Sequence, residues 1–264
     1  MKENFDFSVV KIANAGFGVE ALRDLQAGEI LLTEKPLIVV EAGIKDENIS
    51  WREKVQYLQR KVSNLPKKKQ KMFMSLHDCK QEDGKDKSIS GIFRTNNFAL
   101  GPDPRYADHG VFHLSSRLNH SCFPNCETVW NQETGVQSVI VIRETLKGEE
   151  LTLCYLNEDD RYSDVDKRKH KLEQYGFLCT CKACLDEEEC GGHYLEKLHD
   201  LKDSLNHQTE QVEDTCVKID EILEDSGSKL MWRIRNLEKY EEQSTAISNK
   251  LNYLKSLISE SNFL

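Results

Sequence analysis

Three cysteines within six residues, Cys179-x-Cys181-x-x-Cys184, constrain the folding of this chain more than any other feature of its sequence. Thiolates this close together can converge on one metal ion if the chain turns tightly, and Zn²⁺ in a structural site takes four ligands in a tetrahedron. The fourth ligand must therefore come from another part of the chain. The residue types alone leave these candidates open: Cys122, Cys126, Cys190, His193 and His199.

The composition favours a globular protein of a reducing compartment. The chain is 38% hydrophobic and 31% charged over 264 residues, as soluble domains are, and no apolar run approaches the roughly 20 residues of a membrane span. Its first ten residues lack the apolar segment of a secretory signal. We expect a nuclear or cytoplasmic protein, neither secreted nor membrane-bound, whose nine cysteines are thiols or metal ligands.

The charge distribution bears on the partners of the chain. A net charge of −9 argues against direct binding to nucleic acid, because Lys and Arg supply most of that affinity. It is compatible with attraction of a basic peptide, and equally with a soluble acidic protein. The run Lys67-Lys68-Lys69-Gln70-Lys71 resembles a short nuclear import signal, although such a run is more often a solvated helix face.

Short apolar segments separated by turns predict a mainly β fold with helices, of the α+β class. Apolar residues at helical spacing between 50 and 78 predict helices with a break at Pro66, and the polar segment 79–91 predicts a loop. The expected strands are 9–12, 19–22, 30–32, 111–114, 127–130, 136–142 and 151–155, with turns at 16–18, 26–28 and 131–135.

The sequence changes character after residue 195. Leu198, Leu205, Val212 and Ile219 recur at a spacing of seven residues, and a second such series begins at Leu230 after a polar break. This spacing predicts two long amphipathic helices in a hairpin. We therefore expect a separate C-terminal helical region over 195–264, which offers a surface to a protein partner.

A polar cluster follows one of the expected strands, in the run 117–126 (RLNHSCFPNC). Its Asn and His side chains beside a turn fixed by proline could cradle a ligand, or could satisfy one another within the turn. His120 and Cys122 also suggest a thiol nucleophile, but the sequence shows no third group that would activate it.

Taken together, these motifs resemble the SET-domain lysine methyltransferases, and within them the branch that carries a MYND zinc finger. The match covers residues 8–185. The MYND finger itself is missing, because residues 41–90 contain a single cysteine, Cys79. The matching segments are Gly16-Phe17-Gly18, Thr95-Asn96-Asn97-Phe98, the RxxNHSCxPN-like run 117–125, the GEELTxxY-like run 148–155, and Tyr175-Gly176-Phe177 ahead of the cysteines.

The resemblance implies a SET-type fold of short sheets with a closing segment threaded in a pseudoknot-like manner. It implies a SET domain over 1–185, with a helical insertion at about 41–90 and a cysteine-rich post-SET segment at about 175–190. It also selects Cys122 as the fourth ligand of one structural Zn²⁺, beside Cys179, Cys181 and Cys184. One metal ion would then tie the closing segment to the loop that binds the cofactor.

The activity that the resemblance implies is methyl transfer from S-adenosylmethionine to a lysine of a histone or another protein. Tyr155 matches the catalytic tyrosine. By the same resemblance, the cofactor is contacted by Gly16, Phe17, Gly18, Asn96, Asn119, His120 and Phe177, and the lysine channel is lined by Tyr175 and Phe112. Core packing is the alternative role for each aromatic residue.

Two other functions stay open at this point. A catalytically silent SET fold could act as an interaction protein through its helical hairpin, and it need not bind the methyl donor. A zinc-stabilised module that binds DNA or RNA is the third possibility, and the acidic balance disfavours it.

Overall fold

The structure of the chain is a computed structural model that describes residues 5–13, 15–45, 48–81 and 85–190, with isolated positions between 195 and 210. The chain divides into two compact units, residues 1–161 with 166–181 and residues 162–165 with 182–264. The helical hairpin expected over 195–264 lies outside the described residues apart from those isolated positions. The hairpin, the domain boundaries and the threaded closing segment therefore stay predictions.

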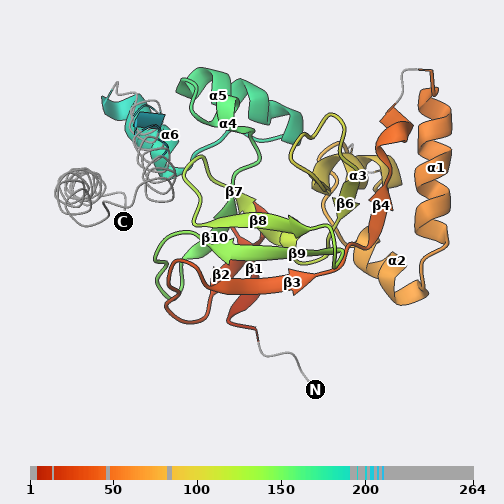
Figure 1. Cartoon of the computed structure of the whole chain (residues 1–264), viewed down its shortest axis with the longest axis horizontal. Coiled ribbons are helices and arrows are strands. Elements are labelled where there is room, and N and C mark those ends of the chain that lie inside the picture. Colours follow the sequence, from red (N-terminus) through yellow and green to blue (C-terminus); the bar gives the residue numbers. More distant parts are fainter. Residues whose placement is uncertain are drawn as a thin grey trace, which may run out of the picture. The chain divides into compact units, whose positions relative to one another are not determined.

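Three small sheets form the frame of the first unit (Figure 1). Their strand orders are β1-β2-β10-β7, β3-β9-β8 and β4-β6-β5. Runs of strands and runs of helices follow one another along the chain, which is the α+β class that the sequence predicts. The strands are β1 (Phe7–Ile12), β2 (Gly16–Ala21), β3 (Ile30–Glu34), β4 (Ile38–Val40), β5 (Asn97–Ala99), β6 (His109–Val111), β7 (Asn119–His120), β8 (Cys126–Asn131), β9 (Val136–Val141) and β10 (Glu150–Leu153).

Helices form on both sides of Pro66, as the spacing of the apolar residues predicts. Ser50 caps the first helix in a capping box, in which its side chain accepts from the backbone of Glu53 while the Glu53 carboxylate accepts from the backbone of Ser50. The next helix begins directly after Pro66. The helices are α1 (Trp51–Ser63), α2 (Lys67–Met74), α3 (Ile89–Asn96), α4 (Glu158–Arg161), α5 (Val165–Leu172) and α6 (Lys182–Cys190), with 3₁₀ turns η1 (Ala42–Lys45), η2 (Ser115–Arg117) and η3 (Glu173–Tyr175).

No helix in the described part of the chain has both the length and the apolar character that crossing a membrane requires. In the second unit, α6 buries Ala183 and Cys184. Further along that unit, the backbone N–H of Leu195 donates to the Glu187 carboxylate at 3.1 Å. This carboxylate is itself buried.

Two of the expected local structures are wrong in detail. Residues 16–18 are not a turn: they open β2, where Gly16 pairs with Ile12 of β1. The strand expected at 111–114 ends at Val111. The reason is the carboxylate of Glu34, which accepts hydrogen bonds from the three backbone N–H groups of residues 113–115 and from the Ser115 hydroxyl. Those N–H groups are therefore not available to a neighbouring strand.

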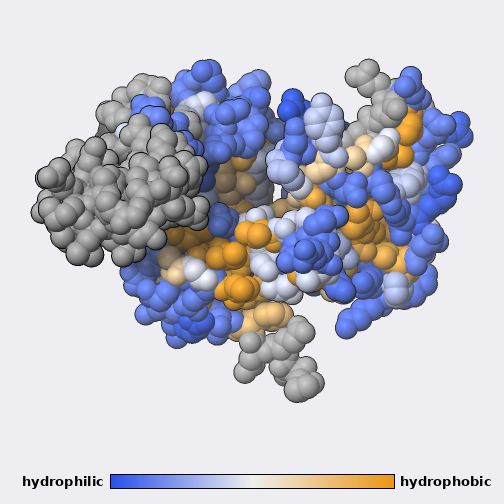
Figure 2. Space-filling view, in the orientation of Figure 1, coloured by the Kyte–Doolittle hydropathy of each residue, from blue (hydrophilic) through white to orange (hydrophobic). Residues whose placement is uncertain are grey.

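Two buried apolar clusters hold the first unit together. One joins the first two sheets, and Tyr155 packs against its edge. The other joins the third sheet to the helical insertion, through Leu58 and Val62 of α1 and Phe73 of α2. Figure 2 shows hydrophilic residues on the outer side of α1 and hydrophobic residues between α1 and the sheets, as expected of an amphipathic surface helix.

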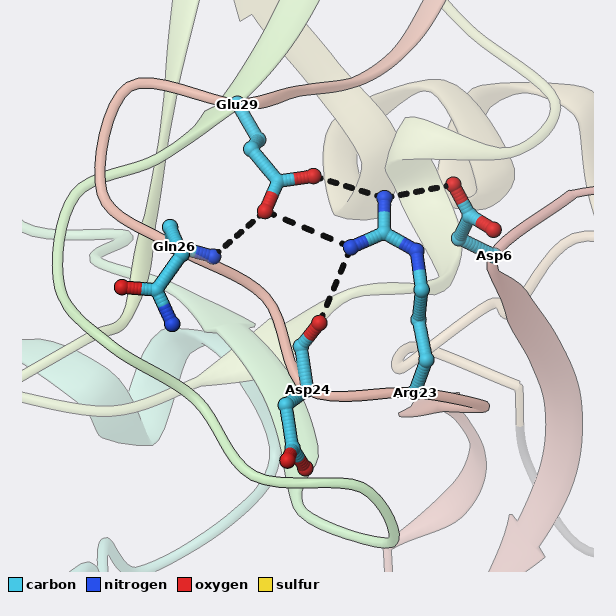
Figure 3. A network of polar contacts seen from close by, with 5 residues as sticks. All are labelled: Asp6, Arg23, Asp24, Gln26 and Glu29. Atoms are coloured by element: carbon cyan, nitrogen blue, oxygen red, sulfur yellow. Dashed lines mark hydrogen bonds and ion pairs between the residues drawn. The ribbon is translucent and has the colours of Figure 1, made fainter.

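An exposed charge network ties the start of the chain to the turn before β3 (Figure 3). The guanidinium of Arg23 donates to the carboxylates of Asp6 and Glu29, at 2.8 and 2.6 Å. Glu29 also accepts from the backbone N–H of Gln26. Hydrogen bonds from Arg23 lower the pKa of both carboxyl groups. Because the network is open to solvent, it orients this turn and adds little to stability.

Strand β10 brings together three motifs that are far apart in the sequence. It pairs antiparallel with β2, where Leu151 lies opposite Val19, and parallel with β7, where Leu153 lies opposite His120. The buried amide of Asn125 extends this pairing: it donates to the carbonyl of residue 150 and accepts from the backbone N–H of residue 152. The GFG, NHSC and GEELT segments thus share one sheet.

Candidate active site and metal centre

Four rings from three separate segments form an aromatic cluster at the end of this sheet. Tyr155 follows β10, His120 ends β7, and Tyr175 and Phe177 flank Gly176 after α5. The centroid of the Tyr155 ring lies 5.1 Å from that of Tyr175, 5.3 Å from that of His120 and 6.5 Å from that of Phe177. His120 and Phe177 are 6.1 Å apart. The structure therefore brings together four of the residues that the sequence predicts for the site.

The short segment 118–120 holds both the hydroxyl and the backbone N–H of Tyr155. Its hydroxyl donates to the carbonyl of Leu118 at 2.7 Å, and its backbone N–H donates to Nδ1 of His120 at 3.0 Å. Burial, and then the neighbouring Tyr175, raise the pKa of the Tyr155 hydroxyl well above its usual range. The phenol is thus neutral at physiological pH, and its oxygen keeps the capacity to accept further contacts.

The closing segment that carries Tyr175 is fastened by the loop after α2. The carbonyl of Gln174 accepts hydrogen bonds from the ammonium of Lys80 and, weakly, from the thiol of Cys79. Gly176 has a positive φ of 80°, which favours glycine, and a Cβ there would meet the backbone of Cys79 at ordinary contact distance. Burial raises the pKa of the Tyr175 hydroxyl. Nothing in the sequence around Cys79 and Lys80 marks this role.

The glycine motif lies beside the NHSC segment. The exposed ring of Phe17 lies under the guanidinium of Arg117, with 5.6 Å from the guanidinium carbon to the ring centroid. A Cβ on Gly18 would come within 3 Å of the Asn119 amide and of the Glu150 carboxylate, so a glycine is required for this close approach. The amide of Asn119 donates to that carboxylate at 2.8 Å. Gly16 precedes them as the first residue of β2.

Two predicted site residues have their side chains in the core instead. The amide of Asn96 donates to the carbonyls of His77 and Ile92, both at 2.7 Å. Phe112 is fully buried, and its ring packs edge-on against those of Phe98 and Trp130. Among the described residues, its ring contacts do not include the aromatic cluster around Tyr155. The structure thus favours core packing for Phe112 over a place in the lysine channel.

Cys122, Cys179, Cys181 and Cys184 converge as the resemblance implies. Their four sulfurs all lie within 4.8 Å of one another, and Sγ of Cys122 is 3.9 Å from Sγ of Cys179. Cys126, which could also have been the fourth ligand by residue type, faces the apolar core, where burial raises its thiol pKa to about 12. The side chains of Cys190, His193 and His199, the remaining candidates for that position, lie outside the described part of the chain.

Hydrogen-bond donors and cations surround these sulfurs. The backbone N–H of Cys122 donates to Sγ of Cys181 at 3.4 Å, and Nε2 of His120 lies 3.3 Å from Sγ of Cys122. Nε of Arg161 donates to the carbonyl of Cys122. Burial lowers the pKa of His120 to about 4. The charge of Cys181 opposes this shift, and the charges of Arg168 and Arg161 add to it. Both arginines thus lie near the cysteines.

This environment fits a zinc ion with four thiolate ligands. Such a centre carries a net charge of about −2, because four thiolates surround one Zn²⁺. Arg168 is fully buried, and a buried cation is costly unless negative charge lies nearby. The N–H donors and the two arginines supply the positive environment that favours thiolates over thiols. Nothing in the sequence marks Arg168, which stands in a basic stretch typical of an exposed helix.

Comparisons with known proteins point to one family. The family description "SET domain" matches residues 16–156. Histone-lysine N-methyltransferase set5 of Schizosaccharomyces pombe is 28% identical over 196 residues, which are 74% of this chain and 54% of that protein.

Two further relatives match shorter segments. Mouse histone-lysine N-methyltransferase SMYD3 is 40% identical over 81 residues, 30% of this chain and 18% of that protein. Human protein-lysine N-trimethyltransferase SMYD5 is 32% identical over 106 residues, 39% of this chain and 25% of that protein. The chain thus matches about half the length of one of these relatives, and a quarter or less of the other two.

Proposed function

The chain belongs to the SET-domain family, and from this membership we propose that it is a protein-lysine N-methyltransferase that uses S-adenosylmethionine. The relatives are named as histone-lysine or protein-lysine methyltransferases. The observation that carries the proposal is the half-buried ring of Tyr155, which packs beside the rings of Tyr175 and Phe177 and whose phenol stays neutral. We further propose a histone or another protein of the nucleus or cytoplasm as substrate, and one structural Zn²⁺ held by the four cysteines.

The target lysine must be neutral to act as a nucleophile. A free lysine has a pKa of about 10.4, so removal of its proton at pH 7 costs roughly 4–5 kcal/mol. Bound S-adenosylmethionine supplies a methyl group on a positively charged sulfur. A dry channel lined by Tyr175 would lower the lysine pKa by desolvation, and the buried character of that hydroxyl supports such a channel.

Tyr155 orients the reacting groups and takes no proton. Its hydroxyl proton is donated to Leu118, so the oxygen is left with acceptor sites that suit weak C–H···O contacts with a methyl group. Phe177 and His120 are placed to pack on the donor, with Asn119 and the backbone around Phe17 beside them. Because the phenol stays neutral over the working pH range, general base catalysis by Tyr155 is not part of the proposal.

Removal of one hydroxyl tests the proposal. We expect the zinc-loaded protein to transfer labelled methyl groups from S-adenosylmethionine to histones or to proteins of a cell extract. Tyr155→Phe should lower kcat about 10- to 100-fold, equivalent to roughly 1.4–2.7 kcal/mol, with little change in KM for the donor. Tyr106→Phe is the matched control, because this tyrosine is 77% exposed and lies outside the site.

The outcome that contradicts the proposal is equally definite. Transfer that is absent from all substrates, together with no binding of S-adenosylmethionine in calorimetry, would leave the chain as a silent SET fold. Mass spectrometry of the extract proteins that lose label in Tyr155→Phe would identify the substrate.

A further inference from the structure

The imidazole of His120 makes two hydrogen bonds: Nδ1 accepts one, and Nε2 takes part in the other. The backbone N–H of Tyr155 lies on Nδ1 at 3.0 Å, and Sγ of Cys122 lies 3.3 Å from Nε2. A backbone amide can only donate, so Nδ1 is the unprotonated nitrogen of a neutral ring. The ring proton is then on Nε2, where it is donated to the sulfur. One tautomer satisfies both contacts.

This ring joins a metal ligand to the backbone of Tyr155. The hydroxyl end of Tyr155 is fixed separately, by the carbonyl of Leu118 at 2.7 Å. Leu118 and His120 stand two residues apart on the same short segment, and Leu118 is buried in the core. Of the two points that hold the tyrosine, the hydroxyl end therefore depends on core packing, while the backbone end depends on His120.

An ion shared by the four cysteines would fix the sulfur end of this connection. Cys122 is fully buried and its sulfur lies 3.9 Å from that of Cys179. A ligated thiolate has a fixed position and accepts strongly from an N–H donor, whereas a free thiol rotates about its Cα–Cβ bond. Donors to metal ligands commonly fix the ligand's orientation and raise the metal affinity.

We propose that His120 is a positioning residue that transmits the geometry of the four-cysteine metal site to Tyr155. The metal fixes the Cys122 sulfur, the sulfur fixes the imidazole, and the imidazole fixes the backbone N–H of Tyr155. This inference rests on the proposed function only for the role of Tyr155. It gives the metal site a second effect besides stabilising the fold, because the backbone end of Tyr155 is positioned through it.

Three substitutions separate the two hydrogen bonds. His120→Asn keeps an acceptor near the position of Nδ1 and loses the donor to Cys122. His120→Gln keeps a donor near Nε2 and loses the acceptor for Tyr155. His120→Phe loses both and keeps a ring beside Phe177. His109→Phe is the matched control, because His109 also uses both ring nitrogens, for Asn97 and the carbonyl of Pro104, within another sheet.

Exchange of Zn²⁺ for Cd²⁺ in protein labelled with 3-fluorotyrosine measures the connection directly. Cd²⁺ has longer bonds to sulfur, so the ligands move while the site stays filled and the chain stays folded. We expect the ¹⁹F resonance of Tyr155, identified by its absence from Tyr155→Phe, to shift on exchange in the wild type and in His109→Phe. In the three His120 variants this shift should fall to a small fraction of the wild-type value.

The rate of metal loss to a chelator distinguishes the two hydrogen bonds. His120→Asn and His120→Phe should lose metal about 10-fold faster than the wild type, within the usual range for a lost donor to a metal ligand, while His120→Gln should stay within about 3-fold. In zinc-loaded His120→Gln, kcat should fall about 10-fold.

A Tyr155 shift of equal size in the wild type and in all three variants would overturn the proposal, as would unchanged metal loss in His120→Asn. Both spectroscopic and metal-release measurements need no methyl transfer. An inactive chain would therefore contradict the proposed function without affecting this inference, and the two failures can be told apart.

Discussion

Arg168 is the largest of the fully buried side chains in the described part of the chain. Its sequence neighbours are charged, and the sequence of its helix is typical of a solvent-exposed one. Transfer of an unbalanced guanidinium into the interior costs several kcal/mol. Burial raises the pKa of the nearby Cys154 thiol, and the charges of Arg161 and Arg168 act against that rise. At the scale of single residues, the buried arginine would match the negative charge of the proposed four-thiolate zinc centre.

Replacement of this cation by an apolar side chain should weaken metal binding. We expect Arg168→Met to lower the affinity for Zn²⁺ about 10- to 100-fold, measured by competition with a chromogenic chelator. Arg143→Met is the control, since that half-buried guanidinium interacts with Cys126. Equal zinc affinity in both variants would contradict the charge match.

At the scale of elements, the start of α3 is locked to the loop that fastens the closing segment. The buried carboxylate of Asp78 accepts from the backbone N–H groups of Lys80 and Ser88 and from the Ser88 hydroxyl. Ser88 in turn caps α3. A Cβ on Gly91 would overlap the Asp78 carboxylate. The absence of a side chain at Gly91 therefore lets the loop that carries Asp78 pack against α3. Lys80 of the same loop donates to the carbonyl of Gln174.

Gly91→Ala separates packing from helix propensity. Propensity alone predicts a gain of about 1 kcal/mol for alanine inside a helix, whereas forced packing predicts a loss of about 1–3 kcal/mol. We expect the loss to prevail, with a lower unfolding free energy in urea. Gly43→Ala is the control, because a Cβ at Gly43 meets nothing within 4 Å. A stabilised Gly91→Ala would show that the loop moves away at little cost.

At the scale of the whole molecule, histidines held neutral by the fold set its response to acid. Burial lowers the pKa of His120 to about 4. Burial, and then the charge of Arg117, also lower the pKa of His113, against the opposing effect of Glu34. The pKa of both histidines is lower in the folded chain than in the unfolded chain. Below about pH 6.5, the unfolded chain therefore binds more protons than the folded chain. Stability is therefore present above pH 6.5 and falls as the pH drops.

Urea unfolding at pH 7 and at pH 5 measures this dependence. We expect the unfolding free energy of the metal-free protein to be lower at pH 5 than at pH 7, through His120 and His113 together. His113→Gln should reduce the difference between the two pH values, while His170→Gln, at an exposed position, should leave it unchanged. A wild-type free energy that rises toward pH 5 would contradict the direction of both shifts.

Much of the framework could be predicted because it depends on neighbours in sequence. The hairpin of β8 and β9 follows from alternating apolar residues around a glycine turn, and the break between α1 and α2 follows from Pro66. The end of β6 could not be predicted in the same way. It depends on the Glu34 carboxylate, about 80 residues away, which takes the N–H groups that a longer strand would need.

The sequence by itself determined that three cysteines, Cys179, Cys181 and Cys184, can share a metal, because their spacing is local, and the family motif added Cys122. Only the tertiary structure decided that Cys126 lies in the apolar core while Cys122 joins the cluster. It also decided that Phe112 is a core residue, that Arg168 is buried, and that His120 links the cysteines to Tyr155. These outcomes depend on burial and on contacts between distant segments, which leave no local pattern in the chain.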